Sequence, residues 1–190
     1  MMLKDKVKLP NDENRIRDRI LIDYLNNDDI RRSTGLTEFT FNREVPENDT
    51  DGRTDIKVEI RNPYRSAKAY YIIECKRLND DNVSGVSGLN AAYIKDGICR
   101  FVNRHYSTIC GINGLIGFVV VKLDINVNTG HINTLLKTRI NCNMVQEIKK
   151  EHFIPNFEYH YSSRHKDCED KLFTLYHLMF DYSNNIEKAL

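Results

Sequence analysis

The chain has 190 residues, 41% of them hydrophobic, which is enough for a single domain with a real core. Its 28 basic and 27 acidic residues leave a formal net charge of +1, which excludes both a polybasic arm and an acidic tail. A nucleic-acid partner would therefore have to bind a local basic patch.

The first part of the chain predicts one helix followed by three strands. Cap-forming residues at 10–14 precede apolar residues at helical spacing, and this helix ends at the polar run 26–29. Rough alternation predicts a strand over 37–45, and a turn rich in Asn, Asp and Gly separates it from a strand over 55–60. The strand expected over 69–75 is apolar without interruption, which indicates a central position covered on both faces.

Helix and strand signals continue in the second part of the chain. Helical spacing predicts a helix over 90–106, and a very apolar run predicts a strand over 115–123. Further along we expect a turn at 126–130, one or two helices over 131–150, a strand over 157–162 and a helix over 170–181. No linker or repeat interrupts the chain, so residues 1–190 are expected to form one domain, with a core at about 10–123 and an elaboration at about 124–190.

An acidic residue and a Glu-x-Lys tripeptide stand at the ends of two expected strands. Asp55 opens the second strand, and Glu74 and Lys76 follow the apolar run of the third. Because alternate residues of a strand share a face, Glu74 and Lys76 point the same way and Cys75 points opposite. Burying two carboxylates and an ammonium together is costly unless the charges pair or a cation binds. The pattern therefore indicates a candidate metal-dependent active site.

The element order, together with Asp55 and Glu74-x-Lys76, resembles the PD-(D/E)XK nuclease superfamily, which includes restriction endonucleases, junction resolvases and many defence or repair nucleases. The resemblance implies an α/β fold: a restriction-endonuclease-like mixed β-sheet core of order αβββαβ, flanked by helices, with a C-terminal α/β extension. The spacing of the two acids suits neighbouring antiparallel strands joined by a hairpin. The proline expected before the first acid is Thr54 here.

The resemblance also implies a function: a Mg²⁺-dependent endonuclease that hydrolyses phosphodiester bonds, with DNA as the expected substrate and a role in restriction, defence or repair. Asp55, Glu74 and the carbonyl oxygen of Cys75 would bind Mg²⁺ or Mn²⁺, hard cations that prefer oxygen ligands. Lys76 would position or activate the attacking water, and a nearby cation should lower its pKa. In related folds an acid on the first helix can complete the site, and Glu13 is the only glutamate there. Cleavage of both strands would imply a homodimer.

Basic residues in the middle and near the end of the chain are candidates for nucleic-acid binding. They are Arg53, Lys95, Arg100, Arg104, His160 and Arg164. Arg100 and Arg104 are four residues apart and share a helix face, where they could grip phosphates. His160 and Arg164 lie among aromatic residues that could stack on bases. A solvated helix face, and an ordinary edge strand and turn, are the plainer interpretations of the same residues.

Two other functions are compatible with the charged motif. A catalytically inactive fold of the same kind could bind nucleic acid or protein, and a different hydrolase could share the acids and the lysine. No Gly-rich phosphate loop, Ser nucleophile elbow or His-Glu-x-x-His motif supports the different hydrolase. A metal bound between Asp55 and Glu74, with cleavage lost in Lys76→Ala, would distinguish a nuclease from a binding module.

Cysteines and apolar runs bear on the compartment. The five cysteines are widely spaced and form no Cys-x-x-Cys, which argues against a disulfide scaffold and a zinc ribbon. The first six residues lack the apolar segment of a signal peptide, and no run approaches the length that spans a membrane. We therefore expect a cytoplasmic protein with no membrane partner.

Overall fold

The computed structural model describes residues 7–46, 53–60, 70–106 and 110–187, and the structural statements below refer to these residues. Its strands are β1 (Phe39–Pro46), β2 (Arg53–Ile60), β3 (Tyr70–Leu78), β4 (Ile112–Val119), β5 (Met144–Lys150), β6 (His160–Lys166) and β7 (Leu172–Asp181). Its helical segments are α1 (Glu13–Ile20), continued by η1 (Leu21–Leu25); α2 (Asp28–Thr34); α3 (Leu89–Ala92), continued by η2 (Tyr93–Ile98) and α4 (Cys99–Val102); and α5 (Ile125–Thr138).

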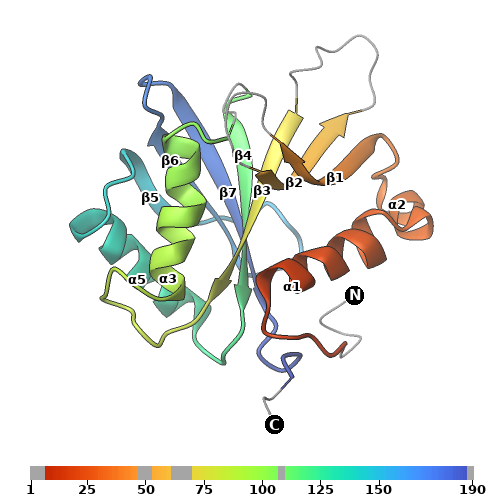
Figure 1. The fold of residues 1–190 in the computed structure, drawn as a ribbon, viewed down its shortest axis with the longest axis horizontal. Coiled ribbons are helices and arrows are strands. Elements are labelled where there is room, and N and C mark those ends of the chain that lie inside the picture. Colours follow the sequence, from red (N-terminus) through yellow and green to blue (C-terminus); the bar gives the residue numbers. More distant parts are fainter. Residues whose placement is uncertain (1–6, 47–52, 61–69, 107–109, 188–190) are drawn as a thin grey trace.

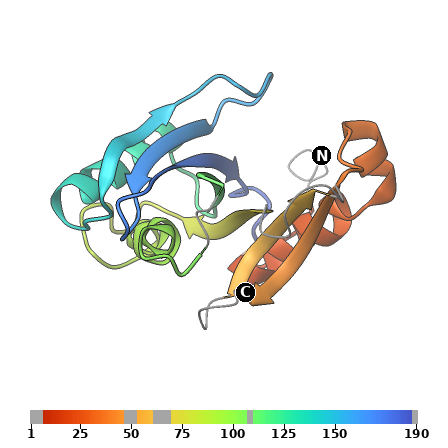
Figure 2. The ribbon, with the colours of Figure 1, turned by 90° about the horizontal axis from the view of Figure 1, so that it is seen from above.

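The fold is mixed α/β, with a seven-stranded mixed sheet in the order β1-β2-β3-β4-β7-β6-β5. Strands β1, β2 and β3 are antiparallel neighbours, and β4 runs parallel to β3 after the crossover through α3, η2 and α4. Strand β7 is parallel to β4, whereas β6 and β5 are antiparallel to their neighbours. Figures 1 and 2 show α1 and α2 beside β1 and β2, and α3 and α5 beside the remaining strands.

Buried side chains form two clusters, one on each face of the sheet. The first contains Ile72 of β3 and packs it against residues of η2, α4 and α5. The second contains Cys75 of the same strand and packs it against residues of α1 and η1. Ile72 and Cys75 are both fully buried, which confirms that β3 is a central strand covered on both faces.

The expected first helix begins where its capping residue predicts. Asp12 is in an extended conformation, and its side chain accepts a hydrogen bond from the backbone N–H of Arg15 at 2.9 Å. Glu13 follows as the first helical residue, where a negative charge is stabilised by the helix dipole. This cap fixes the start of α1, and so the position from which Glu13 reaches the sheet.

Three of the expectations for residues 126–162 are wrong. The turn expected at 126–130 lies inside α5, because Asp124 caps this helix by accepting a hydrogen bond from Val127 N at 3.0 Å. The helix expected over 131–150 ends at residue 138 and is followed by β5. The strand expected over 157–162 begins only at residue 160, as β6.

The helix expected over 170–181 is strand β7. Phe173, Leu175, His177 and Met179 are buried, and the residues between them are more exposed. Several of the apolar residues also fit helical spacing, so the sequence allows both periods. The segment pairs with β4 on one side and with β6 on the other, and this long-range pairing selects the strand.

One disulfide, which the wide cysteine spacing did not predict, joins Cys99 at the start of α4 to Cys142, just before β5. The remaining three cysteines are free. Within the described ranges, no helix has the length and apolar character needed to cross a membrane. The cytoplasmic location stays a prediction.

Candidate active site

The charged residues meet where β2 and β3 separate. The pairing of the two strands ends with Ile56 opposite Ile73, and Asp55 and Glu74 are the next residues along each strand. Beyond that point the backbone N–H of Cys75 donates a hydrogen bond to a side chain of β2, because Asp55 Oδ2 accepts it at 2.8 Å. The start of β2 is thereby fastened to the strand that carries the Glu-x-Lys tripeptide.

Lys76 lies at the centre of the cluster, and its side chain is only 8% exposed. Its Nζ lies 2.7 Å from Glu74 Oε1, 3.0 Å from Glu13 Oε1 and 3.9 Å from Asp55 Oδ2. It also donates a hydrogen bond to the carbonyl oxygen of Cys75 at 2.8 Å. The structure therefore brings the four predicted site residues and the predicted carbonyl together around one ammonium group.

Glu13 connects the first helix to the end of β3. Its Oε1 accepts a hydrogen bond from Lys76 Nζ, and its Oε2 accepts one from the backbone N–H of Arg77; both are 3.0 Å long. Glu13 thereby holds Lys76 in place, and its part in binding a metal ion stays a prediction.

Arg17 is a member of the cluster that the sequence analysis missed. Its guanidinium is 3% exposed and contacts Asp55 Oδ1 at 2.7 Å. It also contacts Asp18 Oδ1 at 2.9 Å and Glu44 Oε1 at 3.0 Å, and so joins α1 to β1 and β2. The available signal was its spacing, since residues four apart on a helix, such as Glu13 and Arg17, share a face.

Arg100, one of the predicted nucleic-acid-binding residues, reaches the cluster from α4. Its Nη1 lies 3.1 Å from Glu74 Oε1 and donates to Tyr106 Oη at 2.7 Å. Tyr106, which sequence reasoning also missed, in turn donates to the carbonyl oxygen of Arg53 at 3.0 Å. The side chain of Arg53 lies 3.9 Å from Glu44, near the rim of the cluster.

The other predicted nucleic-acid-binding residues lie outside this cluster. Lys95 donates to the carbonyl oxygen of Val86, and Arg104 pairs with Asp167 and Glu169. His160 is 1% exposed and lies in β6 with the exposed Arg164, on the far side of β4 and β7 from the separated strands. A role for these residues in binding stays a prediction.

Burial and neighbouring charges shift the proton affinities of Glu74 and Lys76. Burial and the nearby Asp55 carboxylate raise the pKa of Glu74 to about 7, against the opposing effect of Lys76 and Arg100. Burial alone would lower the pKa of Lys76, but Glu74, Glu13 and Asp55 raise it above its usual value. The lowered pKa expected for Lys76 assumed a nearby cation; as the site stands, Lys76 is an ammonium that donates hydrogen bonds.

Glu74 retains one open position for a ligand. Its Oε2 atom is buried and has no hydrogen-bond partner among the described residues, an arrangement that costs free energy. In the same part of the chain, no group of three or more His, Cys, Asp and Glu side chains is arranged to hold a metal ion. Any ion at this site would therefore need Glu74 and Asp55 together with main-chain, water or substrate oxygens.

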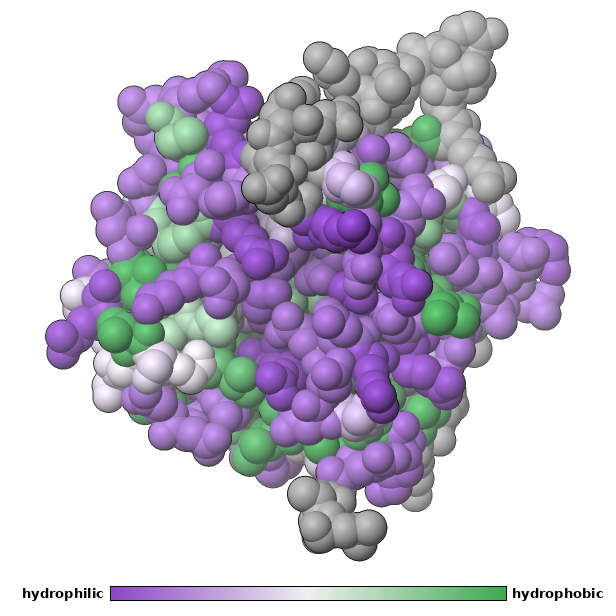
Figure 3. Space-filling model, in the orientation of Figure 1, coloured by the Kyte–Doolittle hydropathy of each residue, from purple (hydrophilic) through white to green (hydrophobic). Residues whose placement is uncertain are grey.

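The cluster has equal numbers of acidic and basic side chains: Glu13, Asp55 and Glu74 against Arg17, Lys76 and Arg100. Hydrophilic side chains cover the middle of the face shown in Figure 3, between α1 and the helix that begins with α3.

Comparisons with protein-family models, curated proteins and solved structures found no match for this chain. A function must therefore be inferred from the geometry of the cluster.

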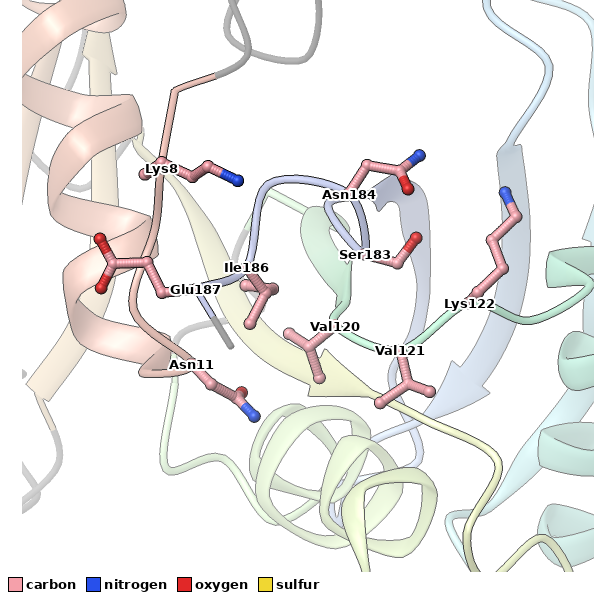
Figure 4. Close-up of a pocket in the computed structure, with 9 residues that line it drawn as sticks. All are labelled: Lys8, Asn11, Val120, Val121, Lys122, Ser183, Asn184, Ile186 and Glu187. Atoms are coloured by element: carbon pink, nitrogen blue, oxygen red, sulfur yellow. The ribbon is translucent and has the colours of Figure 1, made fainter. Parts of the chain in front are cut away.

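A groove of about 900 Å³ lies elsewhere, near the ends of β4 and β7. Figure 4 shows Lys8 and Glu187 on one side of it and Lys122 on the other. Its charges are mixed, and Lys122 already pairs with Asp181 at 2.8 Å. None of the six cluster side chains lines this groove, so we place the chemistry at the separated strands.

Proposed function

We propose that the chain is a metal-dependent nuclease that hydrolyses phosphodiester bonds, with DNA as the expected substrate. The observation that carries this proposal is the convergence of Asp55, Glu74 and Lys76 where β2 and β3 separate. The order of the elements also supports it, since three antiparallel strands, a helical crossover and a parallel fourth strand agree with a restriction-endonuclease-like core.

The donor atoms fit a hard divalent cation. Asp55, Glu74 and the carbonyl oxygen of Cys75 would hold Mg²⁺ or Mn²⁺, and the unpartnered Oε2 of Glu74 is the atom with most to gain. Both Asp55 oxygens already accept one hydrogen bond, and each retains a further lone pair. The bound ion would supply Lewis-acid stabilisation of the charge that develops on the phosphate.

The protein side chains have separate roles in this proposal. The Lys76 ammonium donates hydrogen bonds to the attacking water or to the phosphate and offsets negative charge in the transition state. Glu13 and the Cys75 carbonyl orient that ammonium. Arg17 orients Asp55 through the contact between its guanidinium and Asp55 Oδ1 at 2.7 Å.

Cleavage of supercoiled plasmid, with Mg²⁺ or with a chelator, tests the proposal. We expect Mg²⁺-dependent cleavage by the wild type and a loss of at least about 100-fold in both variants, since Glu74→Gln weakens binding of the ion that would stabilise transition-state charge and Lys76→Ala removes an ammonium that does so directly. Calorimetry with Mn²⁺ should separate the two roles, because Glu74→Gln loses a ligand charge whereas Lys76→Ala retains both carboxylates. Arg19→Ala, which removes an exposed arginine paired with Asp23, is the control.

A second candidate function is a binding module without catalysis. The observation that favours it is the balance of three acidic and three basic side chains, which needs no metal to be neutral. In that case the wild type would retain labelled DNA or RNA on a filter but leave plasmid intact with either metal. Unchanged plasmid cleavage by Glu74→Gln would also contradict the nuclease proposal, because cleavage would then arise elsewhere.

A further inference from the structure

Arg100 is the most exposed of the three cations in the cluster. Its side chain is 40% exposed, against 8% for Lys76 and 3% for Arg17, whereas its partner Glu74 is fully buried. The Arg100 guanidinium therefore joins a buried carboxylate to a side chain that reaches the solvent. A ligand that binds Glu74 Oε1 must compete with Arg100 for that oxygen.

Arg100 is also the cation with the weakest hold on the acids. Lys76 contacts Glu13, Glu74 and the Cys75 carbonyl, and each of these contacts is 3.0 Å or shorter. Arg17 has three carboxylate partners of its own. The contacts of Arg100 in the cluster are one Glu74 oxygen at 3.1 Å and the neutral hydroxyl of Tyr106.

The charge balance favours an exchange of partners. When all three acids and all three bases are ionised, an added divalent cation leaves an excess of two positive charges in a partly buried site, which is unfavourable in a medium of low dielectric. A phosphodiester brings one negative charge, and guanidinium groups bind phosphate well through paired hydrogen bonds. The phosphodiester reduces the excess to one positive charge, and a guanidinium that the metal ion displaces from Glu74 gains a new anionic partner in the phosphate.

We propose that Arg100 is an exchangeable cation, which pairs with Glu74 in the free protein and moves to the substrate phosphate when the metal ion and nucleic acid bind. This inference rests on the proposed nuclease function. It makes Arg100 a competitor of the metal ion in the absence of substrate and a catalytic residue in its presence. Metal ion and nucleic acid should consequently bind cooperatively, each raising the affinity of the other.

Opposite effects on metal affinity and turnover test this exchange. Mn²⁺ binding is measured by calorimetry without DNA for the wild type, Arg100→Ala, Arg100→Gln and the Arg19→Ala control. We expect both Arg100 variants to bind Mn²⁺ at least about fivefold more tightly than the wild type, the lower end of typical coupling between sites. The same variants should cleave plasmid about 100-fold more slowly, because transition-state charge loses a partner.

Calcium, used as an oxygen-binding stand-in for Mg²⁺, gives the cooperativity directly. In the wild type, a short DNA duplex should raise Ca²⁺ affinity at least about fivefold, and this coupling should shrink in Arg100→Ala. A residue with only a structural role would lower metal affinity and turnover together. Circular dichroism and urea unfolding establish that the variants are folded, and Arg100→Gln, which retains most of the side-chain volume, serves if Arg100→Ala is not.

Two outcomes would overturn the inference in distinguishable ways. If the wild type binds Mn²⁺ and cleaves DNA, but neither Arg100 variant gains Mn²⁺ affinity, the exchange is refuted and the nuclease proposal stands. If the wild type neither binds Mn²⁺ nor cleaves, the nuclease proposal fails and the exchange fails with it.

Discussion

Two polar clusters lie against the same sheet and are built in opposite ways. The first is the charged cluster at the separation of β2 and β3. The second lies among β6, β7 and η2, and consists of a chain of neutral side chains. Tyr93 Oη lies 2.8 Å from His177 Nδ1, His177 Nε2 lies 2.8 Å from Ser163 Oγ, Ser163 Oγ lies 2.9 Å from His165 Nε2, and His165 Nδ1 lies 2.9 Å from the Cys142 carbonyl.

In the second cluster, every side-chain O–H and ring N–H group of these four residues can donate a hydrogen bond to the next member. A consistent assignment has Tyr93 donating to His177, His177 to Ser163, Ser163 to His165, and His165 to the carbonyl of Cys142. Burial lowers the pKa of His165 to about 4 and that of His177 to about 3, so both rings are neutral at physiological pH. Each ring nitrogen of His165 and His177 therefore already has a hydrogen-bond partner.

The first cluster, by contrast, leaves a buried carboxylate oxygen without a partner and holds Glu74 at a raised pKa of about 7. Burial of polar groups is therefore a poor guide to function when taken alone. The informative feature is incomplete pairing, because a group that is costly in the free protein gains most when a ligand arrives.

Removal of Arg17 should have the largest effect on stability. Arg17→Met leaves Asp55 near the interior without its main partner, and breaking one side of a buried ion pair costs about 3–5 kcal/mol of unfolding free energy. Plasmid cleavage should fall as well, since Asp55 loses its orientation. Urea unfolding and the plasmid assay measure the two effects. A loss of stability in which the folded fraction still cleaves at the wild-type rate would make Arg17 purely structural.

Interruption of the neutral chain should affect stability alone. Ser163→Ala leaves a nitrogen of each of two buried histidines without a partner, which should lower the unfolding free energy by about 1–3 kcal/mol. Cleavage per folded molecule should equal that of the wild type. If cleavage drops while unfolding is unchanged, the contrast between the two clusters is wrong.

The two clusters should also give opposite slopes of stability against pH. Glu74 keeps its proton in the folded state up to about pH 7, whereas its ordinary pKa is 4.5, so stability should decline as the pH rises from 4.5 to 7. The histidines, ordinarily of pKa 6.5, take up protons more readily in the unfolded chain, so their contribution declines as the pH falls below 6.5.

The variant Glu74→Gln separates the two contributions to stability. One titrating group changes the unfolding free energy by up to about 1.4 kcal/mol per pH unit. Urea unfolding of this variant between pH 4 and pH 8 should lack the decline toward pH 7 and keep the decline toward acid. Glu38→Gln, which alters an exposed glutamate, is the matched control. Identical pH profiles for the wild type and Glu74→Gln would remove Glu74 from this account.

The sequence predicts the elements that position Asp55, Glu74 and Lys76 because each follows a local pattern. Strand β3 begins with an unbroken apolar run over residues 70–73, and α1 has its capping residue Asp12. Arg17 and Tyr106 were missed because a basic residue on a helix and a tyrosine near a helix end have no local sign of their distant partners. Strand β7 was missed because its neighbours β4 and β6 decide between two periods that the sequence allows equally.

The position of β7 within the sheet affects biosynthesis. It is the last of the seven described strands in chain order, yet it lies between β4 and β6 in the sheet. Strands β5 and β6 pair with the rest of the sheet only through it. During translation β5 and β6 must wait for residues 172–181, and a premature stop before them would remove β7 and leave β5 and β6 without their connection to the sheet.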